Sequence, residues 1–325
     1  MTRALVTGIT GQDGGYLTEH LVADGVEVHG MVHAGDPAVA DFRERHPDVP
    51  LHAGDLADHA GIARLVAEVA PDELYNLAGI SSVAFSWEEP VLTAELSGVA
   101  AAVLMRAALD LQESAARRVA VVQASSAEIF GQAETAPQDE GTPIRPVSPY
   151  GAAKAYAHHM ARVYRGRGAH VATTILFNHE SPRRPETFVT RKITAGVARI
   201  ARDGTGTLRL GNLDARRDWG WAPDYVDAMV RAARHRVADD FVVATGRTHS
   251  VAEFVAAAFA RVGIADWERH VVVDPQFVRP VDATAQVGDA TKAHRELAWS
   301  PTVPFEEIVG RMVDHDVALL RDAVG

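Results

Sequence analysis

The sequence contains no cysteine, only three lysines and no long uninterrupted apolar run. Without cysteine it can form no disulfide and no cysteine-ligated zinc site, and we expect it in the cytoplasm. No apolar run approaches the roughly 18 residues of a membrane helix, so we expect no membrane association. The first residues run directly into a segment typical of a β-strand, which argues against a signal peptide.

Acidic residues outnumber basic ones, and the formal net charge is -11 over 325 residues. Nucleic-acid phosphates require a basic face, so no nucleic-acid partner is expected. A small anionic ligand needs only a local cluster of arginines. Because lysine is so scarce here, each of Lys154, Lys192 and Lys292 is a candidate for a specific role. No metal site is predicted.

The first half of the chain alternates short β-branched runs with amphipathic stretches, which predicts an α/β fold. The predicted strands are Ala4–Thr7, Val26–Met31, Leu51–Ala53, Glu73–Asn76, Val119–Ala124 and Val171–Phe177. The predicted helices are Tyr16–Ala23, Ala60–Val69, Val91–Leu111 and Pro149–Arg165. This order is typical of a doubly wound parallel sheet of the Rossmann type, with helices on both faces.

The second half is less regular and predicts a smaller mixed α/β lobe that binds substrate. Its predicted helices are Phe188–Arg202, Val226–His235, Val251–Val262 and Pro304–Ala323. A strand at Phe241–Ala244 is expected to rejoin the sheet. We therefore predict a dinucleotide-binding domain of residues 1–177, rejoined by about residues 212–246. The interleaved substrate lobe is residues 178–325.

A glycine-rich turn, GITGQDG at 8–14, follows the first predicted strand and opens the first helix. Glycines let the backbone turn tightly against a pyrophosphate, and the helix N-terminus supplies amide donors. The spacing Gly-x-x-Gly-x-x-Gly is typical of extended short-chain dehydrogenases, and its position at a strand–helix junction favours dinucleotide binding over a simple turn. The residues predicted to bind the cofactor here are Gly8, Thr10, Gly11, Gln12, Asp13 and Gly14.

The ends of the third and fourth strands offer further cofactor contacts. The Asp55 carboxylate can accept a hydrogen bond from an adenine amino group, although Asp55 or Asp58 would also serve as the N-cap of the next helix. Small residues follow the fourth strand, as a backbone beside the cofactor requires. The predicted contacts in these two segments are Asp55, Leu56, Leu77, Ala78 and Ser81.

Tyr150 and Lys154 are four positions apart at the start of a predicted helix, so they share a face. A buried cation near a tyrosine lowers the pKa of the phenol, and the phenolate can then act as a base. The lysine can also hold the ribose hydroxyls of a nicotinamide cofactor. The alternative is a core tyrosine beside a surface lysine.

Two polar residues follow the fifth strand, at the edge of the sheet where doubly wound folds bind ligands. Ser126 can orient a substrate hydroxyl. Glu128 can remove a proton next to a ketone and protonate a leaving hydroxyl, a group that a simple epimerase does not need. The alternative for Glu128 is a solvated carboxylate at a helix start.

Over essentially its whole length the chain resembles GDP-mannose 4,6-dehydratases. The resemblance is carried by GITGQDGGYL (8–17), QASSAEIFG (123–131), SPYGAAKAYA (148–157), LFNHESPRRPETFVTRKIT (176–194), LGNLDARRDWGWAPDYV (210–226), ATGRTHSV (244–251) and two short motifs within 274–293. The blocks at 176–194 and 210–226 are far more specific than the glycine loop.

The resemblance implies roles for individual residues. Ser126, Glu128 and Tyr150 match catalytic positions, Lys154 matches the ribose-binding lysine, and His179 and Arg184 match positions near the nicotinamide end of NADP. The positions implied to hold the nucleotide diphosphate-sugar are Asn178, Lys192, Arg217 and Arg279. Arginine forks suit a diphosphate. The alternatives are an ion pair of Arg217 with Asp214 or Asp218, and a surface charge at Arg279.

The implied reaction converts GDP-mannose, or a close GDP-sugar, to a 4-keto-6-deoxy sugar. Two related readings remain: a nucleotide-sugar 4-epimerase or reductase, and a non-enzymatic cofactor-sensing protein. The family's paired arginines after the second strand, which bind the 2′-phosphate of NADP, are replaced by His33–Asp36. NADP is the expected cofactor with NAD as the alternative. A homodimer is expected rather than a tetramer, with helices Val91–Leu111 and Pro149–Arg165 pairing as a four-helix bundle.

Overall fold

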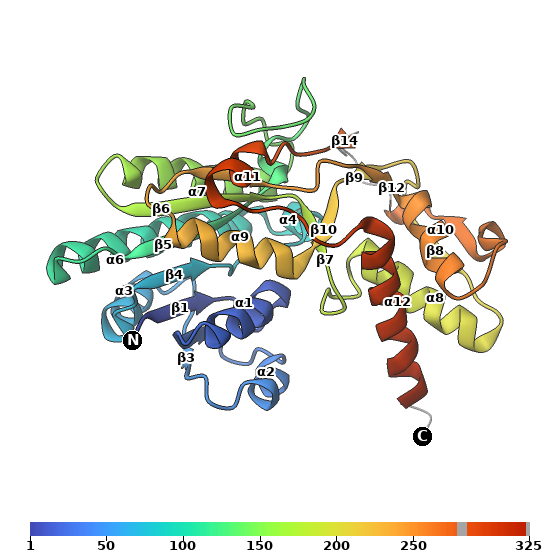
Figure 1. Cartoon of the computed structure of the whole chain (residues 1–325), viewed down its shortest axis with the longest axis horizontal. Helices are drawn as coiled ribbons and strands as arrows, with labels where there is room; N and C mark the ends of the chain where they lie inside the picture. The colour runs from blue at the N-terminus through green and yellow to red at the C-terminus, as the bar shows by residue number, and fades with distance from the viewer. Residues whose placement is uncertain (278–284, 323–325) are drawn as a thin grey trace.

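A seven-stranded parallel sheet forms the centre of the computed structural model, which describes residues 1–277 and 285–322 (Figure 1). The strand order is β3-β2-β1-β4-β5-β6-β11, with the chain reversing its direction of winding between β1 and β4. The strands are β1 (Arg3–Thr7), β2 (Glu27–Val32), β3 (Leu51–Ala53), β4 (Glu73–Asn76), β5 (Ala120–Ser126), β6 (His170–Leu176) and β11 (Asp240–Val243). The predicted doubly wound α/β fold is confirmed.

Helices cover both faces of this sheet, which explains why its central strands are mostly apolar; Glu73, Asn76 and Gln123 are buried polar exceptions. One face carries α1 (Gln12–Ala23), α9 (Ala222–Arg234) and α11 (Thr291–Leu297). The other face carries α3 (His59–Val69), α6 (Ala100–Ala115) and α7 (Pro149–Arg165). A short helix, α2 (Val39–Arg45), lies between β2 and β3 and was not predicted.

The helix predicted over Val91–Leu111 is longer and is interrupted. It consists of α5 (Pro90–Ala94), a π-helical turn η1 (Glu95–Val99) and α6, and it follows an unpredicted helix α4 (Val83–Glu88). At Gly98 in the π turn, an added Cβ would lie 3.3 Å from the Ala153 carbonyl oxygen of α7. The π turn therefore packs closely against α7, which apolar periodicity does not reveal.

By length and composition alone, the helical stretch Pro90–Ala115 is long and apolar enough to cross a membrane. Half of its most apolar window is buried inside the protein, and α6 packs there against α3 and α7. The buried core helix of a soluble protein passes the same test. Glu95, Arg106 and Asp110 interrupt the apolar run, so this helix is weak evidence for a membrane span.

The smaller lobe has its own apolar core between three helices. These are α8 (Val189–Asp203), α10 (Val251–Arg261) and α12 (Phe305–Asp322). Short strands join it to the rest: β7 (Asn178–Glu180) pairs with β10 (Trp219–Trp221), β8 (Leu208–Leu210) with β13 (Val271–Val273), and β9 (Arg216–Arg217) with β12 (His249–Ser250) and β14 (Ala285–Gln286). The single-turn helices are η2 (Ala127–Ile129), η3 (Trp267–His270) and η4 (Pro275–Phe277).

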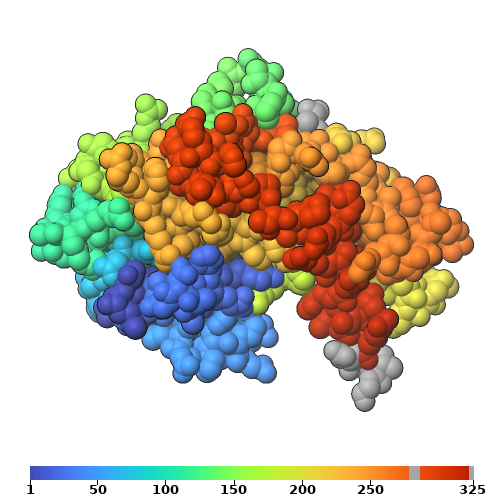
Figure 2. Space-filling view, in the orientation of Figure 1, coloured from blue at the N-terminus to red at the C-terminus, as the bar shows by residue number. Residues whose placement is uncertain are grey.

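The chain passes between the sheet and the lobe several times. It leaves after β6 through β7 and α8, returns for α9 and β11, leaves again for α10, and returns once more for α11 before ending in α12. The return at α11, which packs on β11 and α9, was not indicated by the sequence. Figure 2 shows an indentation at the lower edge of the molecule, between the region of α1 and α2 and the helix α12.

Candidate active site

The glycine-rich turn closes tightly on itself between β1 and α1. The Gly11 amide donates to the Gly8 carbonyl oxygen at 3.1 Å, and Gly8 has φ +69°, a conformation that favours glycine. A Cβ at Gly14 would lie 2.4 Å from that same carbonyl oxygen. Since α1 begins at Gln12, its unpaired N-terminal amides lie directly after the turn, where a pyrophosphate would accept their hydrogen bonds.

A cavity of about 460 Å³ lies at the carboxyl edge of the sheet, where ligands bind in this kind of fold. The predicted cofactor residues that line it are Gly8, Thr10, Gly11, Gln12, Asp13, Gly14, Asp55, Leu56, Leu77, Ala78, Ser81 and Arg184. The lining residues that we had not predicted are Met31, Val32, His33, Asp36, Gly54, Gly79, Ile80, Leu96, Pro185 and Phe188. A larger, shallower depression beside Arg117 and Arg165 lies at the amino ends of β5 and β6, away from the predicted site.

The two readings of Asp55 can now be separated. The N-cap of α3 is Asp58, whose Oδ1 accepts the Gly61 amide at 2.8 Å. Asp55 instead lines the cavity, and its Oδ1 accepts the amide of Ala57 at 2.9 Å. Asp55 is therefore not the N-cap of α3, and its contact with an adenine amino group stays a prediction.

Tyr150 and Lys154 lie in the first turns of α7, which begins at Pro149 as predicted. Ser148 caps the helix by accepting the Gly151 amide at 3.1 Å, and Pro149 occupies the first turn. Lys154 is buried, and its Nζ donates to the Ala124 carbonyl oxygen of β5 at 3.0 Å. Burial lowers the pKa of Lys154 to about 8, so the ammonium gives up its proton more readily than an exposed lysine.

The expected lowering of the Tyr150 pKa is wrong. Burial raises the pKa of Tyr150 to about 12, and the negative charge of Glu128 adds to this, although a hydrogen bond with Ser126 opposes it. The Lys154 ammonium lies 5.8 Å from the centre of the tyrosine ring and is hydrogen-bonded to a carbonyl oxygen. Spacing along the helix predicted the neighbour correctly, but it could not weigh desolvation against a distant charge.

Ser126 and Glu128 lie beside this tyrosine at the end of β5. The Ser126 hydroxyl oxygen accepts the Glu128 amide at 3.2 Å and caps η2. A Cβ at Gly151 would lie 2.6 Å from the Glu128 carbonyl oxygen, so the start of α7 packs directly against η2. This contact brings Ser126, Glu128 and Tyr150 together at one edge of the sheet, with Glu128 only half-buried.

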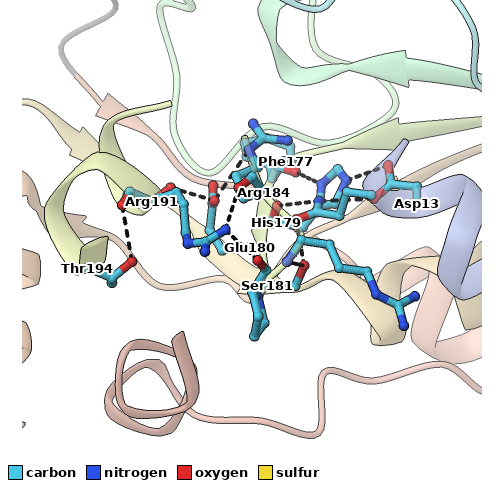
Figure 3. Close-up of polar contacts among 12 residues, drawn as sticks. Asp13, Phe177, His179, Glu180, Ser181, Arg184, Arg191 and Thr194 are labelled. Carbon is cyan, nitrogen blue, oxygen red and sulfur yellow. Dashed lines mark hydrogen bonds and ion pairs between the residues drawn. The ribbon is translucent and has the colours of Figure 1, made fainter. Parts of the chain in front are cut away.

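His179 does not line the cavity. It contacts the glycine-rich turn at residues 8–14, which we call the phosphate loop (Figure 3). Its Nε2 lies 2.9 Å from Asp13 Oδ2, and its Nδ1 lies 2.7 Å from the Phe177 carbonyl oxygen. Both partners are positioned to accept hydrogen bonds, an arrangement that favours an imidazolium with a proton on each nitrogen. Burial alone would lower the pKa of His179, but the charge and hydrogen bond of Asp13 outweigh it and raise the pKa.

Two further contacts join the loop to β7. Gln12 Nε2 donates to the His179 carbonyl oxygen at 3.2 Å, and Ser181 Oγ donates to Gln12 Oε1 at 2.8 Å. Arg184 lies at the same end of the cavity, 3.4 Å from Glu180 and 3.7 Å above the Phe188 ring. The network could not be found from sequence, because its partners lie more than 160 positions apart.

The predicted substrate residues lie on several elements of the lobe and its junction. Asn178 begins β7, Lys192 lies on α8 with its Nζ 3.4 Å above the Phe277 ring, and Arg217 lies buried on β9. Asp218, one proposed ion-pair partner of Arg217, accepts hydrogen bonds from the chain at Thr245, Gly246 and Gly288. Arg279 lies outside the described residues.

Comparison with known proteins gives the same family over the whole chain. A family model described as GDP-mannose 4,6 dehydratase matches residues 5–312. GDP-mannose 4,6 dehydratase 1 of Arabidopsis thaliana is 43% identical over 328 residues, covering 98% of this chain and 90% of that protein. The human GDP-mannose 4,6 dehydratase is 41% identical over 344 residues, with 98% and 92% covered. The solved dTDP-glucose 4,6-dehydratase DesIV of Streptomyces venezuelae, with NAD and TYD bound, has a TM-score of 0.82 at 25% identity and covers 97% and 96%.

Proposed function

The chain belongs to the GDP-mannose 4,6-dehydratase family, and we propose that it converts GDP-mannose, or a close GDP-sugar, to the 4-keto-6-deoxy sugar nucleotide. It is a hydro-lyase that uses a nicotinamide cofactor. The observation that carries the assignment is Glu128 beside Ser126 and Tyr150 at the end of β5. A 4-epimerase or reductase has no step that requires this carboxylate.

Tyr150 starts the reaction by taking the proton of the C4 hydroxyl, while Ser126 orients that hydroxyl. A bound nicotinamide would supply the hydride chemistry, as acceptor at C4 and donor at C6, and its positive charge in the oxidised form would favour the phenolate. That contribution matters because burial holds the pKa of Tyr150 at about 12. Lys154, fixed on the Ala124 carbonyl oxygen, is in a position to hold the ribose hydroxyls.

Glu128 performs the step that distinguishes a dehydratase. The ketone at C4 acidifies the C5 proton, and the Glu128 carboxylate removes it. The same carboxyl group then protonates the C6 hydroxyl, which leaves as water and creates the C5–C6 double bond. Hydride at C6 and a proton at C5 complete the product; this proton balances the one that Tyr150 took from the C4 hydroxyl, so one molecule of water is lost and no cofactor is consumed.

The cavity fits a dinucleotide. The turn at Gly8–Gly14 and the start of α1 would hold the pyrophosphate, and Asp55 would contact the adenine. Ala78 and Leu77 line the wall between the loop and the active site. The reaction itself does not choose between NAD and NADP.

We also propose a homodimer formed by α5, η1 and α7. These adjacent helices expose large apolar side chains: Val91, Leu92, Val99, Tyr156 and Val163. An exposed apolar surface of this kind favours association, and two such helix pairs form a four-helix bundle across a two-fold axis. Light scattering that gives a monomer mass would contradict this arrangement. A cytoplasmic location, without membrane or nucleic-acid partners, completes the proposal.

The activity is tested with GDP-mannose and added cofactor, followed by mass spectrometry. We expect a product lighter by one water, and a deuterium placed at C4 should reappear at C6 because the hydride returns within the same site. A product of unchanged mass would identify an epimerase. Absence of any product from GDP-mannose and close GDP-sugars would reject the dehydratase assignment.

A further inference from the structure

The catalytic residues determine which end of the cavity receives the adenosine. The lining follows the strand order β3, β2, β1 and β4, with the phosphate loop after β1, and Tyr150 lies beside Ser126 at the end of the next strand, β5. A dinucleotide with its pyrophosphate on the loop and its nicotinamide near Tyr150 therefore places its adenosine against the ends of β2 and β3. The lining there is Met31, Val32, His33, Asp36, Gly54, Asp55 and Leu56.

Asp36 is held at the point where this adenosine end meets the phosphate loop. Thr10 Oγ1 of the loop donates to Asp36 Oδ2 at 2.7 Å, and the Ala38 amide donates to Oδ1 at 2.9 Å. A carboxylate between the pyrophosphate and the adenine lies where the adenosine ribose must lie. In dinucleotide-binding folds, an acidic residue about 20 positions beyond the glycines accepts a hydrogen bond from the ribose 2′-hydroxyl.

The surroundings of Asp36 leave its negative charge uncompensated. Both donors are neutral, and within residues 1–277 and 285–322 no lysine or arginine forms an ion pair with it. Arg184 is the one arginine among the described lining residues, and it lies with Glu180 and Phe188. Arg45 of α2 pairs with the exposed Asp41 instead. A 2′-phosphate placed here would meet a carboxylate and no strong cation.

We propose that this cavity selects NAD over NADP and that Asp36 is the residue that makes the selection. Its carboxylate accepts a hydrogen bond from the 2′-hydroxyl of NAD and repels the 2′-phosphate of NADP. The inference rests on the proposed function, because it assumes a nicotinamide cofactor in this cavity. It concerns binding alone, so it can fail or hold independently of which sugar is dehydrated.

The test is a fluorescence titration of the full-length, cofactor-free protein with NADH and with NADPH at pH 8. We expect NADH to bind at least about tenfold more tightly, which corresponds to about 1.4 kcal/mol. Asp36→Asn keeps an oxygen that can accept from Thr10 or Ala38 but removes the charge, and should reduce the preference at least about fivefold. The control Asp48→Asn removes an exposed charge outside the cavity and should leave the preference unchanged.

Equal or tighter binding of NADPH by the wild-type protein would overturn the proposal, as would an unchanged preference in a folded Asp36→Asn variant. If that variant does not fold, Ala34→Arg supplies a cation while keeping Asp36, and it should strengthen NADPH binding alone; no change would count against the proposal. Dehydration of GDP-mannose is measured separately. Failure of that reaction with the NADH preference intact rejects the proposed function only.

His33 also lines the adenosine end and is exposed, so it is the other side chain here that a 2′-phosphate could contact. Histidine gains positive charge on mild acidification. We expect no NADPH preference at pH 6, and His33→Ala should leave the NADH affinity within about twofold, well under the 1.4 kcal/mol of a tenfold change. Tight NADPH binding at pH 6 that His33→Ala abolishes would show that His33 reads the phosphate and would overturn the role of Asp36.

Discussion

Replacing His179 with glutamine tests whether the contact between the phosphate loop and β7 is an ion pair. Asp13 Oδ2 and His179 Nε2 are 2.9 Å apart, with the two side chains 21% and 10% exposed. Glutamine keeps a hydrogen-bond donor but removes the positive charge, so Asp13 is left as a carboxylate without its cation. We expect His179→Gln to lower the free energy of unfolding and to loosen the phosphate loop.

The size of the effect follows from the contacts that remain. Breaking a buried ion pair from one side costs roughly 3–5 kcal/mol. We expect about 3 kcal/mol, the low end of that range, because Asp13 keeps the Gln12 Nε2 donor at 3.1 Å and some access to water. At about 2 °C per kcal/mol for a chain of this size, the melting temperature should fall by roughly 6 °C.

The directions of the two pKa shifts determine how the stabilisation by this pair changes with pH. The pKa of His179 is raised above 6.5, so its contribution is fully present below pH 6.5 and is lost as the pH rises through the folded-state pKa. Burial raises the pKa of Asp13, but His179 outweighs this and lowers it below 3.8, so its contribution is present above pH 3.8 and is lost as the pH falls further. The difference between wild type and His179→Gln should therefore be largest near pH 5–6 and smaller at pH 9.

The matched controls are Asp13→Asn and the double variant. Asp13→Asn should be milder, because the imidazole can release its proton whereas a carboxylate at neutral pH stays charged. In the double variant Asp13→Asn with His179→Gln, we expect the amide pair to recover a coupling energy of about 1.5 kcal/mol or more. Additive losses, or a loss independent of pH between 5 and 9, would show that the pair is a neutral contact and refute the reasoning.

Two further predictions concern the chemistry and the cofactor. Glu128→Gln should slow water loss by about 10²–10⁴-fold while GDP-mannose binding stays within a few-fold; single-turnover mass spectrometry checks this, and full turnover would exclude Glu128 from the reaction. Gly14→Ala puts a Cβ 2.4 Å from the Gly8 carbonyl oxygen and should abolish cofactor retention. The control Gly310→Ala in α12 meets only an arginine side chain at 3.7 Å and should retain cofactor and gain up to about 1 kcal/mol.

The sheet and the catalytic helix were predictable because their signals are local. Strands buried on both faces are mostly apolar, as Ala120–Val122 shows, and the helices between them carry apolar faces. Ser148 followed by Pro149 marks the start of α7, which places Tyr150 and Lys154. These patterns depend on residues close together in the chain, so a single amino-acid sequence is enough to recognise them.

Other features of the fold and the site depend on contacts between residues that are far apart in the sequence. Strands of two or three residues, such as β7 and β9, are too short to show a period of two. The pKa of Tyr150 depends on burial and on the approach of Glu128, neither of which follows from spacing along α7. Asp36 was within reach of the sequence, since it stands about 20 residues beyond the glycines, but its hydrogen bond to Thr10 required the structure.

The short strand β7 connects the phosphate loop with the substrate lobe. His179 is hydrogen-bonded to Asp13 of the phosphate loop, and Glu180 accepts from Thr190 of α8 at 2.6 Å. Two consecutive residues of β7 thus join the phosphate loop to the first helix of the substrate lobe. Since hydride would leave C4 and return to C6 of the same sugar, the sugar must stay bound beside the cofactor between the two transfers. The hydrogen bonds of two adjacent residues in β7 connect the two lobes and thereby help to keep the sugar beside the cofactor.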